Sequence, residues 1–229
     1  MDGILLIDKP SGWTSFDVVA KVRGTLKQAG IKKPKVGHTG TLDPLATGLL
    51  VLVLGNYTKR AQEFSKLDKV YDVTMKLGET STTGDAEGII SKKQDAMGKK
   101  PSQEDIEAVL AGFVGEIDQI PPKFSAIKVD GQRAYKLARE GKEVKLESRK
   151  VTIYEITGLE YAYPEVKFTV KVSSGTYIRS LVEDIGQTLG TGAYMSALQR
   201  IEVGRFSIKS ALSTNELNET TIRKCTQLL

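Results

Sequence analysis

The sequence predicts an α+β fold with a central mixed, mostly antiparallel sheet flanked by helices and loops. Segments with the period of strands and segments with the period of helices interleave along the 229 residues, and several strand segments follow one another as hairpin-like pairs. The hydrophobic fraction of 40% is ordinary for a globular protein, and a chain of this length buries a core without disulfides or metals. We therefore expect a single domain over residues 1–229.

The first third of the chain alternates between apolar strands and amphipathic helices. Residues 3–7 predict a buried strand, and Thr14 or Ser15 then caps a helix that ends near Gly30. The apolar face of this helix is predicted to hold Phe16, Val19, Val22 and Leu26. The elements expected next are a basic loop over 32–41, a buried strand over 49–54, a helix over 57–67 and a half-buried strand over 70–77.

The rest of the chain predicts a basic insertion between further helices and strands. A polar loop over 78–88 precedes a helix that Ser102 caps. Clean alternation over 165–172 predicts a strand that follows another over 151–161. The remaining elements are a short helix over 133–140 inside the insertion, a helix from Ile178, a last strand over 201–208 and a helical tail.

The net charge of +5 is concentrated in one segment. Residues 123–150 hold nine basic and four acidic side chains, a surplus that equals the net charge of the whole chain. Such a segment is either a solvated surface or a surface for an anionic partner, and charge alone favours neither.

Composition excludes several classes of protein. The longest apolar run, over 49–54, is too short to span a membrane, and the N-terminus lacks the basic leader and cleavage site of a secretory signal. Cys225 is the single cysteine and His38 the single histidine, so neither a disulfide nor a zinc site is expected. We expect a cytoplasmic monomer with no metal, no cofactor and no membrane association.

The densest unusual segment is Gly37-His-Thr-Gly-Thr-Leu-Asp-Pro-Leu-Ala-Thr-Gly48. Its glycines allow close approach of the backbone or turns with positive φ. Taken alone, Asp43 before Pro44 is more often a structural turn, and a lone histidine is more often structural than catalytic. The segment lacks the Gly-Lys-Ser/Thr ending of a phosphate-binding loop and the glycine spacing of a dinucleotide site.

This segment resembles the catalytic-aspartate motif of the TruB family of tRNA pseudouridine synthases. Five further blocks resemble motifs of that family and follow in its order over roughly residues 2–218, so chance similarity is negligible. They are Asp8-Lys-Pro-Ser-Gly-Trp-Thr-Ser15, Lys69-Val-Tyr-Asp-Val73 through Thr83-Gly-Asp85, Gln119-Ile-Pro-Pro-Lys-Phe-Ser-Ala-Ile-Lys128, Ser173-Ser-Gly-Thr-Tyr-Ile-Arg-Ser-Leu181 and Leu198-x-Arg-x-x-Val-Gly204.

The resemblance implies a pseudouridine-synthase fold and an isomerase that converts uridine 55, in the T-loop of tRNA, to pseudouridine. Asp43 is implied as the essential carboxylate for breaking the glycosidic bond, and attack at C1′, addition to the ring and proton abstraction from the ribose all stay open. Arg179 is implied to hold this carboxylate, since a guanidinium pairs with it through two parallel hydrogen bonds. Tyr71 is implied to stack on the flipped uracil, with plain core packing as the alternative.

The same resemblance implies contacts with the T-arm of tRNA. His38 would enter the space that the flipped base leaves, and Lys9 would be a positioning contact. An insertion over about residues 120–150, the thumb, would grip phosphates through residues such as Lys128 and Arg133. The substrate pocket would also involve Thr41, Tyr177 and Leu198.

Two details of the sequence refine these expectations. Because helical spacing begins at Ile178, Arg179 is expected in the first helical turn, away from the buried side, with Tyr177 at the junction. Asp85 is expected at most to stabilise its loop.

Two alternatives stay open. Many family members carry a C-terminal PUA domain, for which this chain has no room after its last strand, so we expect a short form of the family, either naturally minimal or truncated. A guide-RNA-dependent synthase would rely on that domain. A non-catalytic RNA-binding or tRNA-folding protein would need the thumb but not Asp43 together with Arg179.

Overall fold

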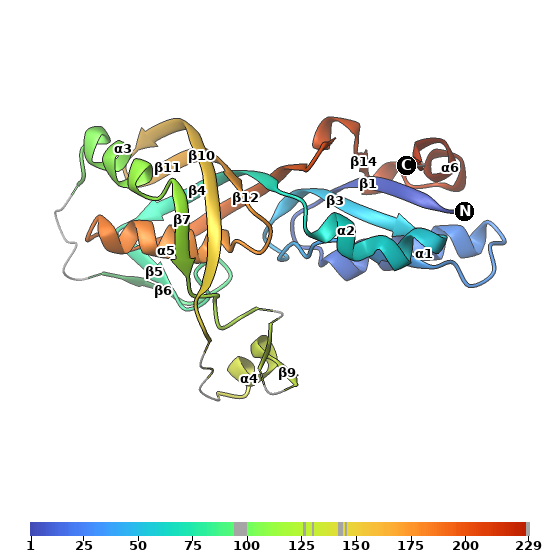
Figure 1. Cartoon of the computed structure of the whole chain (residues 1–229), viewed down its shortest axis with the longest axis horizontal. Coiled ribbons are helices and arrows are strands. Elements are labelled where there is room, and N and C mark those ends of the chain that lie inside the picture. The colour runs from blue at the N-terminus through green and yellow to red at the C-terminus, as the bar shows by residue number, and fades with distance from the viewer. Residues whose placement is uncertain (94–99, 126, 130, 142–143, 145, 228–229) are drawn as a thin grey trace. The chain divides into compact units, whose positions relative to one another are not determined.

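The structure, a computed structural model, describes residues 1–93, 100–125, 127–129, 131–141, 144 and 146–227. The chain forms two compact units, Met1–Asp72 with Leu198–Leu229 and Val73–Ala197. Strands β4 (Lys69–Leu77) and β12 (Ala193–Val203) each begin in one unit and end in the other. Figure 1 shows both units, with most of their helices and longer strands labelled.

The first unit is built on paired strands. β1 (Gly3–Lys9) is antiparallel to β3 (Thr47–Leu54), which also pairs antiparallel with β2 (Val36–His38) and parallel with β12. β14 (Leu212–Ser213) pairs in parallel with β1. The other elements are α1 (Ser15–Gln28), η1 (Gly55–Arg60), α2 (Ala61–Ser65), β13 (Phe206–Ser207), η3 (Ile208–Ser210), η4 (Thr214–Glu216) and α6 (Glu219–Cys225), where η marks a 3-10 helix.

The unbroken apolar run of β1 is explained by cores on both of its faces. Successive side chains of a strand point to opposite faces. Leu5 and Ile7 therefore enter a cluster with α1, whereas Ile4 and Leu6 enter a second cluster with Phe64 of α2. The β1–β3 layer thus fixes the position of the segment that connects β2 to β3.

The second unit centres on two long antiparallel strands. β10 (Arg149–Ala162) pairs with β11 (Glu165–Val172) on one edge and with β7 (Gly115–Gln119) on the other. The strand order in this unit is β12-β4-β11-β10-β7. α3 (Gln103–Gly112) contacts both β10 and α5 (Ile178–Thr188), and β5 (Glu79–Ser81) forms a separate hairpin with β6 (Ile90–Lys92).

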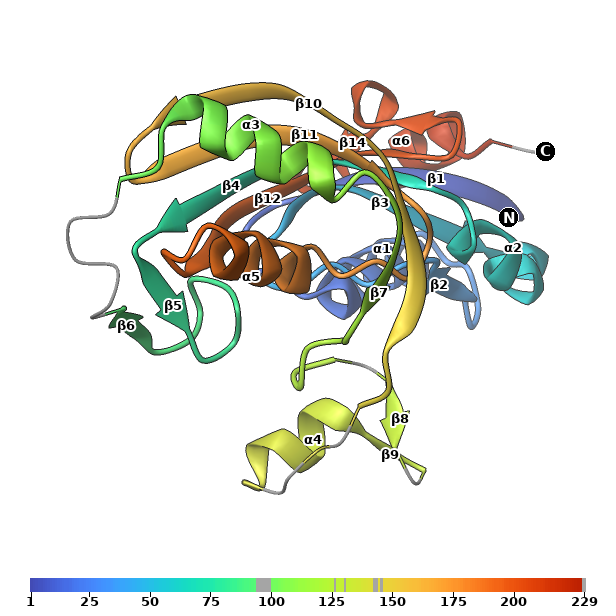
Figure 2. The ribbon, with the colours of Figure 1, turned by 60° about the vertical axis from the view of Figure 1, so that its left-hand side comes forward.

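The basic insertion connects β7 to β10. These strands are neighbours, with Gln119 opposite Arg149, so the chain leaves the sheet and returns to it at one place. Between them lie β8 (Lys128–Val129), β9 (Gln132–Arg133) and α4 (Ala134–Arg139), the last within the helix predicted over 133–140. β8 and β9 pair with each other as a hairpin. Figure 2 shows this hairpin and α4 beyond the ends of β7 and β10.

The predicted α+β class with a mixed, mostly antiparallel sheet is confirmed, and the strand predicted over 165–172 has those bounds. Two predictions are wrong. The strand predicted over 201–208 is not continuous: β12 ends at Val203, Gly204 with a φ of 54° turns the chain, and β13 begins at Phe206. Phe16 is not on the buried face of α1: its side chain is 71% exposed, and Val18 is buried instead.

Within the described ranges, no helix combines the length and the apolar character that a membrane crossing needs.

Candidate functional site

Asp43 lies in the connection between β2 and β3, on a backbone that is fixed from both sides. Ser15, which is 1% exposed at the start of α1, accepts a hydrogen bond from the Leu42 N–H at 2.8 Å and donates to the Leu42 carbonyl at 3.2 Å. The carbonyl of Asp43 accepts from the Ala46 N–H at 3.1 Å, which closes a turn. The half-buried carboxyl group of Asp43 therefore projects from a chain segment with little freedom.

Lys9 fixes the other side of the Asp43 turn. Its side chain is fully buried, and Nζ donates to the carbonyls of Pro10, Trp13 and Pro44 at 3.0, 2.6 and 3.3 Å. Such acceptors are needed because an unpaired buried ammonium group would be strongly destabilising. The sequence predicts Lys9 as a substrate contact; in the structure its ammonium group binds the carbonyl directly after Asp43.

Arg200 of β12 holds the start of the same connection. It is 2% exposed, and its Nε donates to the Leu49 carbonyl at 2.8 Å while Nη2 donates to the Gly40 carbonyl at 3.1 Å. The close approach of β3 and β12 requires Gly48, because its φ is 97° and a Cβ there would collide with the backbone of Arg200.

His38 ends β2, five residues before Asp43. Its ring lies edge-to-face with Phe16, with centroids 5.1 Å apart and an interplanar angle of 85°. Burial, followed by the charge of Arg200, lowers the pKa of His38 below its usual value, so the ring is neutral at pH 7. Nδ1 is buried and has no hydrogen-bond partner among the described residues.

Three other predicted substrate residues belong to the first unit. Tyr71 of β4 and Leu198 of β12 are each 8% exposed. The carbonyl of Leu198 accepts from the Thr47 hydroxyl at 3.4 Å, whereas Thr41 is exposed in the Asp43 connection. The burial of Tyr71 fits both the predicted stacking role and plain packing of its strand.

The second unit places Tyr177 and Arg179 at the start of α5. Tyr177 precedes the helix with extended backbone, and two hydrogen bonds with the buried side chain of Gln119 fix it. Its N–H donates to Oε1 at 2.8 Å, and its carbonyl accepts from Nε2 at 3.0 Å. The predicted helix start at Ile178 is therefore confirmed, with Tyr177 at the junction.

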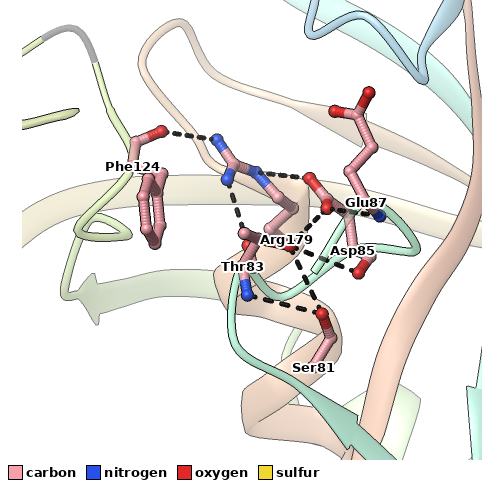
Figure 3. Close-up of polar contacts among 6 residues, drawn as sticks. All are labelled: Ser81, Thr83, Asp85, Glu87, Phe124 and Arg179. Atoms are coloured by element: carbon pink, nitrogen blue, oxygen red, sulfur yellow. Dashed lines mark hydrogen bonds and ion pairs between the residues drawn. The ribbon is translucent and has the colours of Figure 1, made fainter. Parts of the chain in front are cut away.

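Arg179 is buried in the polar cluster that Figure 3 shows. Nη1 donates to the Thr83 carbonyl and Nη2 to the Phe124 carbonyl, both at 3.0 Å, and Nε lies 3.7 Å from Oδ2 of Asp85. The prediction that Arg179 points away from the buried side is wrong. Its side chain is 6% exposed because the loop around Thr83 and the segment at Phe124 cover it.

Asp85 stabilises the loop that contacts Arg179. Its Oδ1 accepts from the Thr83 hydroxyl at 2.5 Å and from the Glu87 N–H at 3.1 Å. The predicted loop-stabilising role is thus confirmed, and the ion pair with Arg179 adds a second role that the sequence did not indicate.

A cavity of about 720 Å³ in the second unit borders the Arg179 cluster. Its lining includes Thr83 and Phe124, which contact Arg179, together with Ser180, Glu183 and Asp184. Burial, with a smaller contribution from the charge of Asp184, raises the pKa of Glu183, and burial also raises the pKa of Asp184. These carboxyl groups therefore keep their protons to higher pH than exposed acids do.

The insertion presents Arg133 to solvent on β9, opposite Lys128 of β8. The side chain of Lys128 lies outside the described part of the structure. The described residues include no group of three or more His, Cys, Asp and Glu side chains arranged to hold a metal ion.

Sequence reasoning missed three supporting residues, Ser15, Gln119 and Arg200. Each is a polar side chain inside one of the six motif-like blocks, and each is at most 2% exposed. Their position inside motif-like blocks was the available signal, because each has a polar neighbour that hides its burial.

Two family models match the chain. Residues 26–178 match the N-terminal domain of the TruB family of pseudouridylate synthases, and residues 179–227 match the C-terminal domain of tRNA pseudouridylate synthase B. Together with the fold and the site, this defines an enzyme of the pseudouridylate synthase class. The chain belongs to the TruB family, as the sequence predicts.

Individual relatives agree with this assignment. tRNA pseudouridine synthase B of Parabacteroides distasonis is 47% identical over 219 residues, which are 94% of this chain and 92% of that protein. The protein of the same name from Burkholderia mallei is 45% identical over 221 residues, 96% of this chain and 70% of that protein. A chain of a solved Cbf5-Nop10-Gar1 complex is similar over 98% of this chain, with a TM-score of 0.74 and 30% identity, and this chain spans 59% of its length.

Proposed function

We propose that this enzyme isomerises uridine 55 in the T-loop of tRNA to pseudouridine, with Asp43 as the essential carboxylate. Relatives named tRNA pseudouridine synthase B, at 45% and 47% identity, support tRNA as the substrate. The observation that carries the role of Asp43 is its turn, whose two flanking residues are held by the buried side chains of Ser15 and Lys9.

The reaction depends on holding the uridine and the carboxylate in place, and it consumes no second substrate. The C1′–N1 bond breaks, the uracil turns and C1′ bonds to C5, while the proton of C5 leaves and N1 gains one. The product is an isomer of the substrate, so nothing is consumed. An ionised carboxylate on a fixed backbone serves attack at C1′, addition to the ring or proton abstraction from the ribose, because each requires an anionic oxygen at a defined point.

The other catalytic roles follow from the chemistry of the side chains. We assign Arg179 to holding the Asp43 carboxylate, and its fixed guanidinium plane supports this because two carbonyls already orient it. Tyr71 is assigned to stacking on the flipped uracil, and Tyr177, fixed by Gln119, to the wall of the same pocket.

The base must leave the folded T-loop before it can react. We assign His38 to the space that the flipped uridine leaves. Its neutral ring supports that role, because a neutral imidazole stacks among bases without needing a counter-charge. The surplus of cations over 123–150 is assigned to phosphates of the T-arm.

The test compares Asp43→Asn with wild type on an unmodified tRNA transcript. Pseudouridine is detected by its selective reaction with carbodiimide. We expect no product from the variant and an affinity for tRNA within a few-fold of wild type, because the side chains are nearly isosteric. Turnover by Asp43→Asn, with deamidation excluded, would refute the assignment.

A matched control and two alternatives complete the experiment. Asp118→Asn makes the same change at an exposed position of β7 and is expected to keep full activity. A wild type that binds tRNA without forming product would be a tRNA-binding or folding protein. Product that appears only after a guide RNA is added would identify a guide-dependent synthase.

A further inference from the structure

Phe16 is an aromatic side chain that the core does not use. Its ring is 71% exposed, whereas Val18, Val22 and Leu26 of the same helix are at most 2% exposed. At 100° per residue, Val22 lies about 120° around α1 from Phe16, which explains why the ring escapes the buried face. A single exposed apolar side chain is common on protein surfaces, so the surroundings of Phe16 decide whether its ring has a ligand.

The exposed ring is next to a predicted RNA contact. Phe16 meets His38 at a centroid distance of 5.1 Å in an edge-to-face arrangement, and His38 is five residues before Asp43. The imidazole is neutral at pH 7 because burial and the charge of Arg200 lower its pKa. The two rings therefore form an uncharged aromatic surface beside the Asp43 connection.

Charges around Phe16 favour a base over a phosphate at the ring itself. Asp17 accepts from the N–H and the hydroxyl of Thr14, at 2.8 and 2.7 Å, and these hydrogen bonds lower its pKa. The carboxylate of Asp17 thus already lies at the N-terminus of α1, where it would repel a phosphate.

Basic side chains lie further along α1, where they could contact the phosphates of a nucleic acid whose base stacks on Phe16. Arg23 and Lys27 are exposed and lie within roughly 20° of Phe16 around the axis of α1. Nη2 of Arg23 donates to the Val36 carbonyl at 2.9 Å, which keeps this face of the helix beside β2. The segment from α1 to β2 adds three exposed lysines, Lys32, Lys33 and Lys35.

We propose that Phe16, together with His38, is a stacking site for an unpaired nucleobase of the RNA substrate other than the uridine that reacts. An aromatic platform followed by cations is the arrangement with which proteins bind single-stranded nucleic acid: bases stack on rings and phosphates meet the cations. This inference rests on the proposed function, because it takes RNA as the ligand. An apolar protein partner fits less well, since the helix face beyond the ring is basic.

The test measures tRNA affinity as a function of salt for Phe16 variants. Removing one base–aromatic stack costs about 5- to 150-fold in affinity, so Phe16→Ala is expected to weaken binding within that range. The slope of log K against log salt should stay that of wild type, because no phosphate contact is lost. Phe16→Trp should bind like wild type, and Phe16→Leu, which is apolar but has no aromatic face, should bind like Phe16→Ala.

Controls separate stacking from misfolding. Phe16 is mostly exposed, so thermal stability should be unchanged in all three variants. Tyr154→Ala removes another exposed aromatic side chain, 46% exposed on β10, and is expected to leave affinity unchanged.

Each other outcome overturns the stacking site. Affinity of Phe16→Ala within two-fold of wild type would exclude a contact, wild-type affinity of Phe16→Leu would exclude stacking, and a flatter salt slope would indicate a phosphate contact. Failure of the proposed function is distinct. In that case wild type forms no pseudouridine, yet the affinity loss of Phe16→Ala still reports base stacking.

Discussion

The guanidinium of Arg179 lies 3.7 Å from the carboxylate of Asp85, with the two side chains 6% and 3% exposed. Both groups also have neutral partners, so neither charge depends on the other alone. Removing one charge from a buried pair costs far more than an exposed pair contributes. The pair therefore binds the loop over 82–88 to the start of α5.

Replacing Asp85 with Asn tests this role. The Asn side chain can still accept from Thr83 and Glu87, but the carboxylate charge 3.7 Å from Nε of Arg179 is removed. We expect the free energy of unfolding, measured by urea denaturation, to fall by about 3 kcal/mol. Glu63→Gln, which removes the exposed pair with Arg60, is the matched control and should show no measurable change. Equal losses in the two variants would contradict a structural role for the buried pair.

Lys9→Met distinguishes support of the Asp43 turn from contact with RNA. Methionine keeps the length of the side chain but removes the Nζ donor from the carbonyls of Pro10, Trp13 and Pro44, of which the last keeps the Gly12 N–H. We expect a loss of about 2–4 kcal/mol in the free energy of unfolding, and an unchanged salt slope of tRNA binding by the folded fraction. Lys27→Met, at an exposed position of α1, should not alter stability. A flatter salt slope with unchanged stability would make Lys9 a phosphate contact instead.

Alanine at Lys123, Arg133 and Lys136 tests whether the insertion grips RNA. All three side chains are exposed. Each lost phosphate contact lowers the slope of log K against log salt by about 0.7–0.9, so two or three contacts lower it by roughly 1.4–2.7. Lys167→Ala, at an exposed position of β11 outside the segment, is the control and should leave the slope unchanged. Parallel salt titrations for wild type and the triple variant would mean that the segment is a solvated surface.

Lys69 gives the stability a specific dependence on pH. Burial, followed by the charge of Arg200, lowers the pKa of Lys69 to about 8 from 10.5. Between these values the unfolded chain binds more protons than the folded chain, so this group makes stability rise with pH from about 8 to 10.5. Relative to Lys69→Met, wild type should gain at most about 3 kcal/mol in free energy of unfolding over that interval. A difference between the two proteins that does not vary with pH would contradict the lowered pKa.

Strong periodicity and composition were enough to predict much of the fold. The alternation over 165–172 gave the bounds of β11, and the spacing from Ile178 gave the start of α5. β12 was misplaced because residues 193–200 mix small, polar and charged residues, and that composition hides a strand in which Arg200 is buried beside β3. Strand prediction from sequence takes charged residues as exposed, so a buried charged side chain such as Arg200 gives the opposite of the expected pattern.

By itself the sequence determined the class of fold, the family and the segment around Asp43, because each depends on the order of residues along the chain. The tertiary structure decided which polar side chains support that segment and which rings reach solvent. Arg179 looked like a surface residue of a first helical turn, yet its carbonyl partners come from 96 and 55 positions away along the chain. Phe16 looked like a core residue, yet α1 turns it outward beside His38. Helical spacing fixes which residues share a face, but only long-range packing decides what covers that face.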